Sequence, residues 1–600
     1  MLAIENYKEK IISTIKKNKF TIISGPTGCG KSTLIPKYLY ELKSPRIAII
    51  EPRRIAVKAL FTYLSRDIPN IGYKMRFDSY VTKETTVTVM TDGVFLNELL
   101  ACRRREKLYL PYDYVIIDEV HERNIRTDII LGVFKANGFH LPFKVILMSA
   151  TMQTEKLKSY FNASLFIIKG RQYKCIIKYE DRPVSDYITE SYIKIKRILR
   201  EQNNIQGKLQ KDILVFLTGE EDINELYELL KRLPQVQPYK IYAALSDIQQ
   251  KMIFSPTHLT KVILATNICE ASLTIPGIKY VIDCGLYKTK IHSGINFLGI
   301  RPISKESADQ RAGRCNRLGD GICYRLYTNT EYQMLGGAVP EIVKTDLSYL
   351  ILFFSYFKID IFTFEFLDYP KKDNAMKALK YLYRLGCIKI TSVLEITDYG
   401  KVLLNNPLEI NLSHFFEQCK KHNLRNAGAM AISLISQENY NFLESINSLN
   451  KENIENSQCD DFQDVLNNEE YNKNIKISDV EYLRELMEKF LHCKDEEKFC
   501  EKLNISYKGM RQAKMISKQL MDIENVNEDI NRFEEVFSKS FEHNISQRQE
   551  NGSYKHLSSG IEVWIHPTSK FFKRKDKFIV FVDAFCSTKK YARIVGKYYK

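Results

Sequence analysis

The sequence has 600 residues, 44% of them hydrophobic, which is enough for several buried cores in about four domains of ordinary size. Lysine and arginine number 89 against 72 acidic residues. The net charge of +17 favours a polyanionic partner such as nucleic acid, although a basic protein without such a partner has the same charge. The 13 cysteines form no C-x-x-C pair and no zinc-like spacing with histidine, so neither a disulfide framework nor a metal cluster is indicated.

Two features restrict where the protein works. No basic and apolar leader opens the chain, and the most apolar run, residues 347–357, is too short to span a bilayer. The scattered cysteines suit a reducing compartment. We therefore expect a nuclear or cytoplasmic protein with no membrane partner.

A phosphate-binding pattern, G-x-x-x-x-G-K-[ST], lies between a predicted strand over residues 20–24 and a predicted helix over residues 34–42. Its glycines let backbone N–H groups surround an anion, and the helix directs its positive end to the same place. Lys31 would reach the outer phosphates, and Ser32 would offer its hydroxyl to Mg²⁺. A chance glycine-rich turn is the alternative. The predicted nucleotide-binding residues are Gly25, Thr27, Gly28, Cys29, Gly30, Lys31, Ser32 and Thr33.

Short apolar runs alternate with helix-length segments over the first half of the chain. Continuous apolar strands separated in this way predict parallel sheets covered by helices on both faces. We therefore predict the α/β class, with two successive parallel-sheet domains that meet near residue 170, of which only the first holds a phosphate loop. The runs lie at residues 46–50, 86–90, 114–118 and 144–148, and then at residues 211–217, 261–265 and 279–283.

The second half of the chain has a different pattern of apolar and polar residues. Beyond residue 340 helical periodicity dominates, as over residues 374–385. Residues 456–474, rich in Asn, Asp and Glu, are expected to form a solvated surface loop rather than a site. Short alternating runs at residues 561–566 and 578–583 predict a small terminal β-barrel.

Two groups of polar residues point to nucleotide chemistry. Asp118 and Glu119 end a predicted strand, where ligands approach parallel sheets, so Asp118 can hold Mg²⁺ and Glu119 can take the proton of an attacking water. A solvated strand end is the alternative. Arg311, Arg314 and Arg317 recur every third residue, so on a helix two or three of them share a face and could converge on one anion. A plain solvated face is the alternative.

The motifs occur in the order found in DEAH-box RNA helicases of superfamily 2, and the chain resembles that family. The matching segments are Gly25 to Thr33, Glu51 to Arg54, Thr91 to Gly93, Asp118 to His121, Ser149 to Thr151, Phe216 to Gly219, Ala265 to Ile268 with Ser272 to Ile275, and Gln310 to Arg317. The similarity continues through the family's later domains. The resemblance implies RecA-like domains at residues 1–169 and 170–335, a winged helix at 336–405, a helical ratchet-like domain at 406–530 and an OB-fold at 531–600.

The resemblance also implies roles for individual residues, with ATP and Mg²⁺ as cofactors. Gln310 would position the attacking water, and two arginines would offset charge on the transferred phosphoryl group. Adenine would lie between Phe254 and Tyr63, where Tyr63 replaces the family's arginine and loosens the nucleotide preference. The catalytic residues would be Lys31, Glu119, Gln310, Arg314 and Arg317, and the metal would be held at Ser32, Asp118 and Glu119.

Further residues would contact RNA or transmit the state of the nucleotide. Contacts to the sugar–phosphate backbone track a strand without reading its sequence. The RNA-binding residues would be Arg53, Arg54, Thr91, Gly219, Thr266 and Asn267, and the coupling residues would be His121, Ser149 and Thr151.

Several departures from the family pattern bear on activity. Asn316 stands where the family has glycine, and Pro276 stands where many members have a ribose-binding aspartate. If the glycine provides a positive φ, asparagine is the least costly replacement. If the glycine is needed for close approach, asparagine displaces the finger at Arg317. In either case Asn316→Gly is expected to be no slower than wild type. Residues 288–300 resemble the family's strand-separating hairpin in a short form, which predicts modest unwinding.

We therefore predict an ATP-dependent RNA helicase that moves 3′ to 5′ on single-stranded RNA and remodels RNA duplexes or ribonucleoproteins. Members of the family act in pre-mRNA splicing, ribosome assembly and RNA surveillance, and we expect splicing, in the nucleus, because many eukaryotic members serve it. We also expect a monomer, and the family implies activation by a protein with a glycine-rich motif. One alternative is an RNA-binding clamp or scaffold with weak or decayed ATPase activity, suggested by Asn316 and Pro276. A P-loop transporter or signalling NTPase is disfavoured, because it would not need the second-domain arginines.

Overall fold

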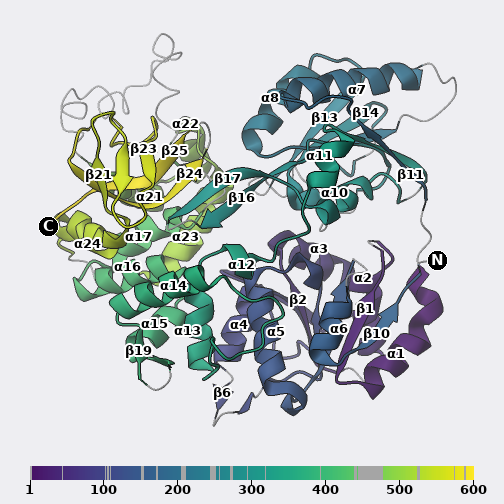
Figure 1. The fold of residues 1–600 in the computed structure, drawn as a ribbon, viewed down its shortest axis with the longest axis horizontal. Helices are drawn as coiled ribbons and strands as arrows, with labels where there is room; N and C mark the ends of the chain where they lie inside the picture. The colour runs from purple at the N-terminus through teal and green to yellow at the C-terminus, as the bar shows by residue number, and fades with distance from the viewer. Residues whose placement is uncertain are drawn as a thin grey trace. The chain divides into compact units, whose positions relative to one another are not determined.

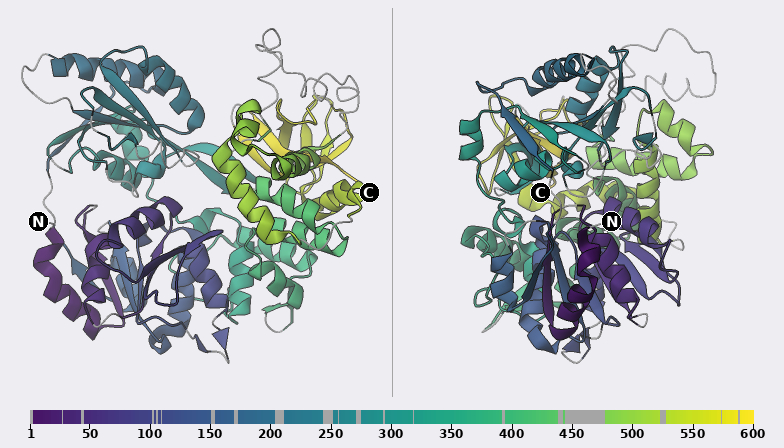
Figure 2. Two further views of the ribbon diagram at one scale, coloured as in Figure 1. Left: turned by 180° about the vertical axis from the view of Figure 1, so that it is seen from behind. Right: turned by 90° about the vertical axis from the view of Figure 1, so that its right-hand side faces the viewer.

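The structure is a computed structural model shown in Figures 1 and 2. The described residues form two compact units. The first lies within residues 3–242, 252–288 and 301–401, and the second lies within residues 289–300 and 402–600. The structure describes residues 3–600 except 27, 43–44, 102, 105–106, 109, 151–153, 170–172, 204–210, 243–251, 256, 271–274, 293–294, 318, 392–393, 438–441, 444–476, 523–527, 573 and 587–588.

The first unit begins with a mainly parallel sheet of strand order β10-β1-β9-β8-β2-β5-β3-β4. Only the pairing of β3 with β4 is antiparallel among the described pairs of this sheet. Three strands are buried along their whole length, which explains their continuous apolar sequences. The strands are β1 (Phe20–Ser24), β2 (Ile47–Glu51), β3 (Ile71–Met75), β4 (Asp78–Tyr80), β5 (Val87–Thr91), β8 (Tyr114–Ile117), β9 (Lys144–Ser149) and β10 (Ser164–Ile167).

Helices cover both faces of this sheet. Ile15, Leu39 and Leu60, from three different helices, share one core with the sheet residues Ile49 and Val89. That face is covered by α1 (Lys8–Lys17), α2 (Lys31–Tyr40) and α3 (Arg54–Leu64), and the other by α4 (Asp92–Ala101), α5 (Ile125–Asn137) and α6 (Glu155–Phe161). The short elements are η1 (Ala3–Tyr7), β6 (Arg103–Arg104), β7 (Lys107–Leu108), η2 (Val120–Glu122) and η3 (Gly138–His140).

A second sheet, of strand order β11-β18-β15-β12-β14-β13, is parallel in its described pairings. One of its cores contains Ile198 and Leu226 from the helices on one face, and the other contains Ala312 from the opposite face. The strands are β11 (Cys175–Tyr179), β12 (Asp212–Phe216), β13 (Val236–Ile241), β14 (Thr260–Ala265), β15 (Ile278–Asp283) and β18 (Gly321–Arg325). The helices are α7 (Tyr187–Asn203) and α8 (Glu220–Leu230) on the first face, η4 (Asn267–Cys269) and α10 (Lys305–Ala312) on the other, and α11 (Asn329–Met334) beyond β18. The predicted fold of two RecA-like parallel-sheet domains is confirmed.

The remainder of the first unit is small and mainly helical. Its most apolar helix, α13, is buried, and Gly132 of α5 lies so close that an added Cβ would be 2.6 Å from Phe354. No helix in the described ranges is long and apolar enough to cross a membrane. The elements are α12 (Glu341–Lys344), α13 (Ser348–Tyr356), α14 (Lys372–Arg384), β19 (Ile388–Ile390), β20 (Leu394–Ile396) and α15 (Asp398–Asn405).

The second unit combines helices with a barrel-like sheet. The sheet order is β16-β17-β24-β21-β22-β23-β25, and a further pairing of β24 with β25 closes five strands into the predicted terminal barrel. The hairpin of β16 (Leu286–His292) and β17 (Asn296–Pro302) adds to it through parallel pairing of Phe297 with Ala584. The barrel strands are β21 (Ser546–Arg548), β22 (Tyr554–His556), β23 (Glu562–Ile565), β24 (Phe578–Cys586) and β25 (Lys590–Lys597).

Helices precede this barrel, as the periodicity of the sequence predicts. The polar segment at residues 456–474, expected to be a surface loop, lies outside the described residues. The boundaries between the five predicted domains stay predictions. The helices are α16 (Ile410–Lys421), α17 (Arg425–Ile435), α21 (Asp479–His492), α22 (Glu496–Lys502), α23 (Tyr507–Leu520), η6 (Ile530–Arg532), α24 (Phe533–Ser540) and η7 (Glu542–Asn544).

Candidate active site

The phosphate loop joins β1 to α2, as predicted. Gly28 and Gly30 have φ values of 79° and 100°, which L side chains adopt only with strain, so glycine is required there. Lys31 is buried at the start of α2, and its Nζ donates hydrogen bonds to the carbonyl oxygens of Gly25 at 2.6 Å and Pro26 at 3.1 Å. The ammonium therefore lies inside the loop, where an anion would meet it. Cys29 lies in the same loop, Ser32 and Thr33 lie in the first turn of α2, and Thr27 lies outside the described residues.

Asp118 follows β8, two strands from β1 in the sheet. Its Oδ1 accepts a 2.8 Å hydrogen bond from the Glu119 N–H, whereas Oδ2 is buried and accepts none. Burial raises the pKa of Asp118, the charge of Glu119 raises it further, and a hydrogen bond with the Ser32 hydroxyl opposes the rise. A hydroxyl and a buried carboxylate oxygen are ligands that Mg²⁺ prefers, so Ser32 and Asp118 fit the ion. Mg²⁺ bound there would supply positive charge beside the phosphates.

Glu119 lies at a sharp backbone turn, with φ 48°. A left-handed conformation is uncommon for glutamate and is typical of functional sites. Burial raises the pKa of Glu119, and the positive charges of Lys31, Arg53 and Arg317 oppose the rise. A buried carboxylate surrounded by cations can accept a proton from water at this edge of the sheet.

His121 connects this turn to the end of β9. Its Nδ1 lies 3.4 Å from the backbone N–H of Ala150 and 3.4 Å from Glu119 Oε2. Burial lowers the pKa of His121 to about 4, so the ring is neutral near pH 7 and can accept from Ala150. The carbonyl of Ser149 accepts a 3.2 Å hydrogen bond from Gly25. His121 and Ser149 are therefore in one hydrogen-bonded region with the phosphate loop, and Thr151 lies outside the described residues.

The prediction that Arg311, Arg314 and Arg317 share one face of a helix is wrong. α10 ends at Ala312, so Arg314 and Arg317 lie in the loop that follows, and only Arg311 is on the helix. Arg311 is fully buried, with its guanidinium 2.7 Å from carboxylate oxygens of both Glu270 and Asp283. Two buried carboxylates neutralise this arginine, which makes it a structural group of the second sheet rather than part of a solvated face.

The two loop arginines are placed differently from Arg311. Arg314 is buried, at 4% exposed. Burial lowers the pKa of Arg317 to about 10, and the negative charge of Glu119 opposes the fall. Gln310, on the last turn of α10, is partly buried. The loop therefore brings a cation from the second sheet domain into electrostatic range of Glu119.

Two aromatic residues predicted to hold adenine are exposed. Tyr63 on α3 is 39% exposed and Phe254 is 50% exposed. Lys37 Nζ lies 4.5 Å from the centre of the Tyr63 ring. Both rings therefore keep surface on which a base can stack.

The predicted RNA-binding residues follow the carboxyl ends of neighbouring strands. In the first sheet these strands are β2 and β5, and in the second they are β12 and β14. Arg53 is held by protein groups, since it pairs with Glu122 at 3.0 Å and donates to the Ile268 carbonyl at 3.2 Å. Arg54 donates to the Arg76 carbonyl at 2.7 Å. The residues at these strand ends are Arg53, Arg54 and Thr91 in the first sheet, and Gly219, Thr266 and Asn267 in the second.

Sequence reasoning missed three buried or paired groups next to the site. Burial raises the pKa of Glu51 well above its usual value, and Asp118 adds to the rise. Burial likewise raises the pKa of Glu122 to about 7. Arg123, with φ 50°, bridges Asp128 and Asp368, both at 2.7 Å. The one signal in the sequence for these three residues is that each lies within or next to a motif.

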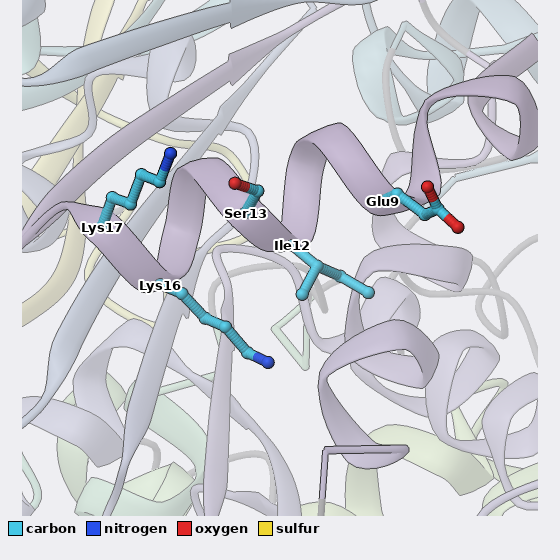
Figure 3. A pocket seen from close by; sticks show the side chains of 5 residues that line it. All are labelled: Glu9, Ile12, Ser13, Lys16 and Lys17. Carbon is cyan, nitrogen blue, oxygen red and sulfur yellow. The ribbon is translucent and has the colours of Figure 1, made fainter.

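One hollow of about 360 Å³ lies outside this site (Figure 3). It runs along α1 and contains none of the described site residues. Its lining residues are Glu9, Ile12, Ser13, Lys16 and Lys17. The hollow is therefore no part of the nucleotide site.

Comparison with known proteins identifies helicase domains in both parallel-sheet regions. A DEAD/DEAH box helicase profile matches residues 5–160, and a helicase conserved C-terminal domain profile matches residues 193–319. The chain is similar to ATP-dependent RNA helicase DHX33 of Homo sapiens, with 30% identity over 99% of this chain and 86% of that protein. It is similar to the protein of the same name from Drosophila melanogaster, with 30% identity over 97% of this chain and 86% of that protein.

The fold and the matching helicase profiles define an enzyme that hydrolyses a nucleoside triphosphate and contains two RecA-like domains. The chain belongs to the DEAH-box RNA helicases of superfamily 2, and it is an ATP-dependent RNA helicase.

Proposed function

We propose that this helicase moves 3′ to 5′ along single-stranded RNA and uses that movement to remodel RNA duplexes or ribonucleoproteins. The direction is the one that the family implies. The observation that supports coupling of hydrolysis to movement is the contact between the two sheet domains at the site, where Arg53 donates a hydrogen bond to the Ile268 carbonyl at 3.2 Å and Arg317 is close enough to Glu119 for their charges to interact. A cation from one RecA-like domain acting on the base of the other links hydrolysis to the arrangement of the two domains.

In this proposal each residue of the site has a separate task. Lys31 binds the outer phosphates, and Glu119 takes a proton from the attacking water. Gln310 orients that water. Arg314 and Arg317 offset the charge that develops on the transferred phosphoryl group. Ser32 and Asp118 would hold Mg²⁺, which with ATP makes up the proposed cofactors.

RNA would be held at the strand ends of both sheets. The side chains and backbone at these ends offer hydroxyl, amide and guanidinium groups, which suit contacts with the sugar–phosphate backbone. The residues are Arg54, Thr91, Gly219, Thr266 and Asn267. Arg53 would join them only after releasing Glu122, because the two side chains are 3.0 Å apart. We therefore expect Arg53 to contribute less to RNA binding than Arg54.

The test is a duplex-unwinding assay with single-stranded tails on defined ends. A duplex with a 3′ tail should be unwound in the presence of ATP and Mg²⁺, and a duplex with a 5′ tail should not. Lys31→Ala, which lacks the phosphate-binding ammonium, should unwind neither. Unwinding from the 5′ tail alone would overturn the proposed direction.

The alternative of an RNA-binding clamp with weak ATPase activity predicts binding to both tailed duplexes without unwinding or turnover. Pre-mRNA splicing, nuclear localisation, a monomeric state and activation by a glycine-rich partner stay predictions from the family. Pull-down from nuclear extract with the Glu119→Gln variant, followed by sequencing of bound RNA, tests the splicing prediction. Enrichment of RNA unrelated to introns would contradict it.

A further inference from the structure

Two thiols meet beside the loop that carries the catalytic arginines. Cys175 is the first residue of β11, and Cys315 lies between Arg314 and Arg317. Their sulfur atoms are 3.6 Å apart, and both cysteines are free thiols. Both sulfurs face the carbonyl oxygen of Ala312, at 3.7 Å from Cys175 and 3.1 Å from Cys315.

The packing of the second sheet brings these thiols together. β11 is the outermost described strand on its side, and it pairs with β18 so that Cys175 is opposite Gly321. A Cβ on Gly321 would lie 2.3 Å from the carbonyl oxygen of Cys315 and 2.5 Å from its sulfur. Because Gly321 has no side chain, Cys315 can pack directly against the paired strands β11 and β18.

The arginine loop is tied to the same segment at a second point. The Asn316 side chain donates a hydrogen bond of 2.8 Å to the carbonyl of Tyr173, two residues before Cys175. A covalent bond at Cys315 would add to this tie and restrict the loop to one arrangement. Arg314 and Arg317 flank that bond directly, so their freedom to approach a nucleotide would be reduced.

We propose that Cys175 and Cys315 form a reversible disulfide that slows ATP hydrolysis when the cellular thiol pool becomes oxidised. The disulfide is a property of the second sheet alone, whereas its effect on ATP hydrolysis rests on the proposed roles of Arg314 and Arg317.

The oxidant is a small-molecule disulfide of the glutathione type. The thiolate of Cys175 attacks one sulfur of that disulfide, the S–S bond breaks, and one glutathione leaves. The thiolate of Cys315 then attacks the sulfur of Cys175, and the second glutathione leaves. Two protein thiols are oxidised, one glutathione disulfide is reduced, and the two protons released by the cysteines end on the two glutathione thiols.

The environments of the two thiols agree with this order of attack. Cys175 is half-buried and accessible to solvent, whereas Cys315 is 1% exposed. The hydrogen bond with Cys315 lowers the pKa of the Cys175 thiol, and the same hydrogen bond and burial raise the pKa of the Cys315 thiol. The sulfurs must then approach by about 1.5 Å to reach the length of a disulfide bond.

The test oxidises the full chain with glutathione disulfide and measures two readouts. After alkylation of the remaining thiols, peptide mass spectrometry should find a peptide pair joined through Cys175 and Cys315. RNA-stimulated ATP hydrolysis should fall about tenfold or more, because displacing one catalytic arginine costs a large factor in rate. Dithiothreitol should reverse both changes.

Two variants of Cys175 and one matched control complete the test. Cys175→Ser and Cys175→Ala should form no such peptide pair, and their ATP hydrolysis should resist oxidation while matching wild type under reducing conditions. Cys493→Ser removes another half-buried thiol, at the end of α21, and should behave as wild type in both readouts.

Glutathione on Cys175 without a link to Cys315 would overturn the proposal. A complete Cys175–Cys315 link that leaves the hydrolysis rate unchanged would overturn the regulatory part. If the reduced protein hydrolyses no ATP, the proposed function fails, and the peptide map still decides whether the disulfide forms.

Discussion

The side-chain amide of Asn316 donates a 2.8 Å hydrogen bond to the backbone carbonyl of Tyr173. Asn316 does not have a positive φ. One reason for expecting Asn316→Gly to be no slower than wild type assumed a positive φ at this position, so that reason does not apply. Because Asn316 lies between Arg314 and Arg317, its contact with Tyr173 holds the arginine loop against the segment that leads into β11. Asn316 is therefore an anchor of this loop.

We expect Asn316→Ala to lower the rate of RNA-stimulated ATP hydrolysis about fivefold, because one hydrogen bond contributes about 1 kcal/mol. Asn316→Gly loses the same bond and gains backbone freedom, so it should be no faster than the alanine variant. Steady-state assays at saturating RNA and ATP measure both rates. A glycine variant as fast as wild type would restore the expectation drawn from the sequence and remove the role of the bond to Tyr173.

A second prediction concerns Arg123, which joins the buried Asp128 of α5 to Asp368. Arg123→Ala leaves a buried carboxylate without its cation and should lower the free energy of unfolding by about 3 kcal/mol. Denaturant titration measures the loss. Lys156→Ala removes the more exposed partner of Asp368 and should lower it by less than about 1 kcal/mol. Equal losses in the two variants would contradict the role given to Arg123.

A third prediction concerns RNA binding by Arg54 at the start of α3. Arg54→Ala should weaken binding to unrelated single-stranded sequences by equal factors, because backbone contacts carry no sequence information. The slope of log affinity against log salt concentration should fall by about 0.7, the value for one phosphate contact on a single strand. Fluorescence anisotropy at several salt concentrations measures it. Arg66→Ala, beyond the end of α3, is the matched control; an identical slope in the Arg54 and Arg66 variants would refute the contact.

A fourth prediction concerns pH and Asp479, which accepts 2.8 Å hydrogen bonds from Ser569, Lys570 and Val595. Burial raises the pKa of Asp479 to about 6, and the donated hydrogen bonds oppose the rise. A raised folded-state pKa favours folding at low pH, and this contribution is lost as the pH rises through about 6. Lowering the pH from 7 to 5 should therefore stabilise wild type by about 1 kcal/mol more than it stabilises Asp479→Asn.

Fluorescence of Trp564, the one tryptophan of the chain, reports unfolding of the barrel in this experiment. Asp495→Asn is the control, since Asp495 caps α22 from an exposed position and should leave the pH-dependent gain in place. The same pH dependence in wild type and Asp479→Asn would show that Asp479 ionises as readily in the folded chain as in the unfolded one.

The strands and the phosphate loop were predictable because their signals are local. The run Ile47–Glu51 is buried along its whole length, and such strands are continuously apolar in sequence. Gly28 and Gly30 are required by their own backbone conformations. In both cases the sequence pattern lies in the same residues that form the strand or the loop.

The contacts that position the site were less predictable because they join distant residues. The every-third-residue spacing of arginines predicted a shared helix face, but α10 ends at Ala312, and Arg311 is neutralised by Glu270 and Asp283. The hairpin was predicted, but its pairing with β24 depends on a strand near the other end of the chain. The approach of Cys175 to Cys315 depends equally on tertiary packing.

The central claim is that Glu119 and the arginine loop form a working ATPase that responds to RNA. Steady-state ATP hydrolysis with and without single-stranded RNA, for wild type and Glu119→Gln, tests it most directly. We expect RNA to stimulate wild type, and the variant to bind RNA but not hydrolyse ATP, because an amide has the shape of the carboxylate but cannot take the proton of water. Wild-type protein that binds RNA tightly and hydrolyses no ATP would contradict the claim.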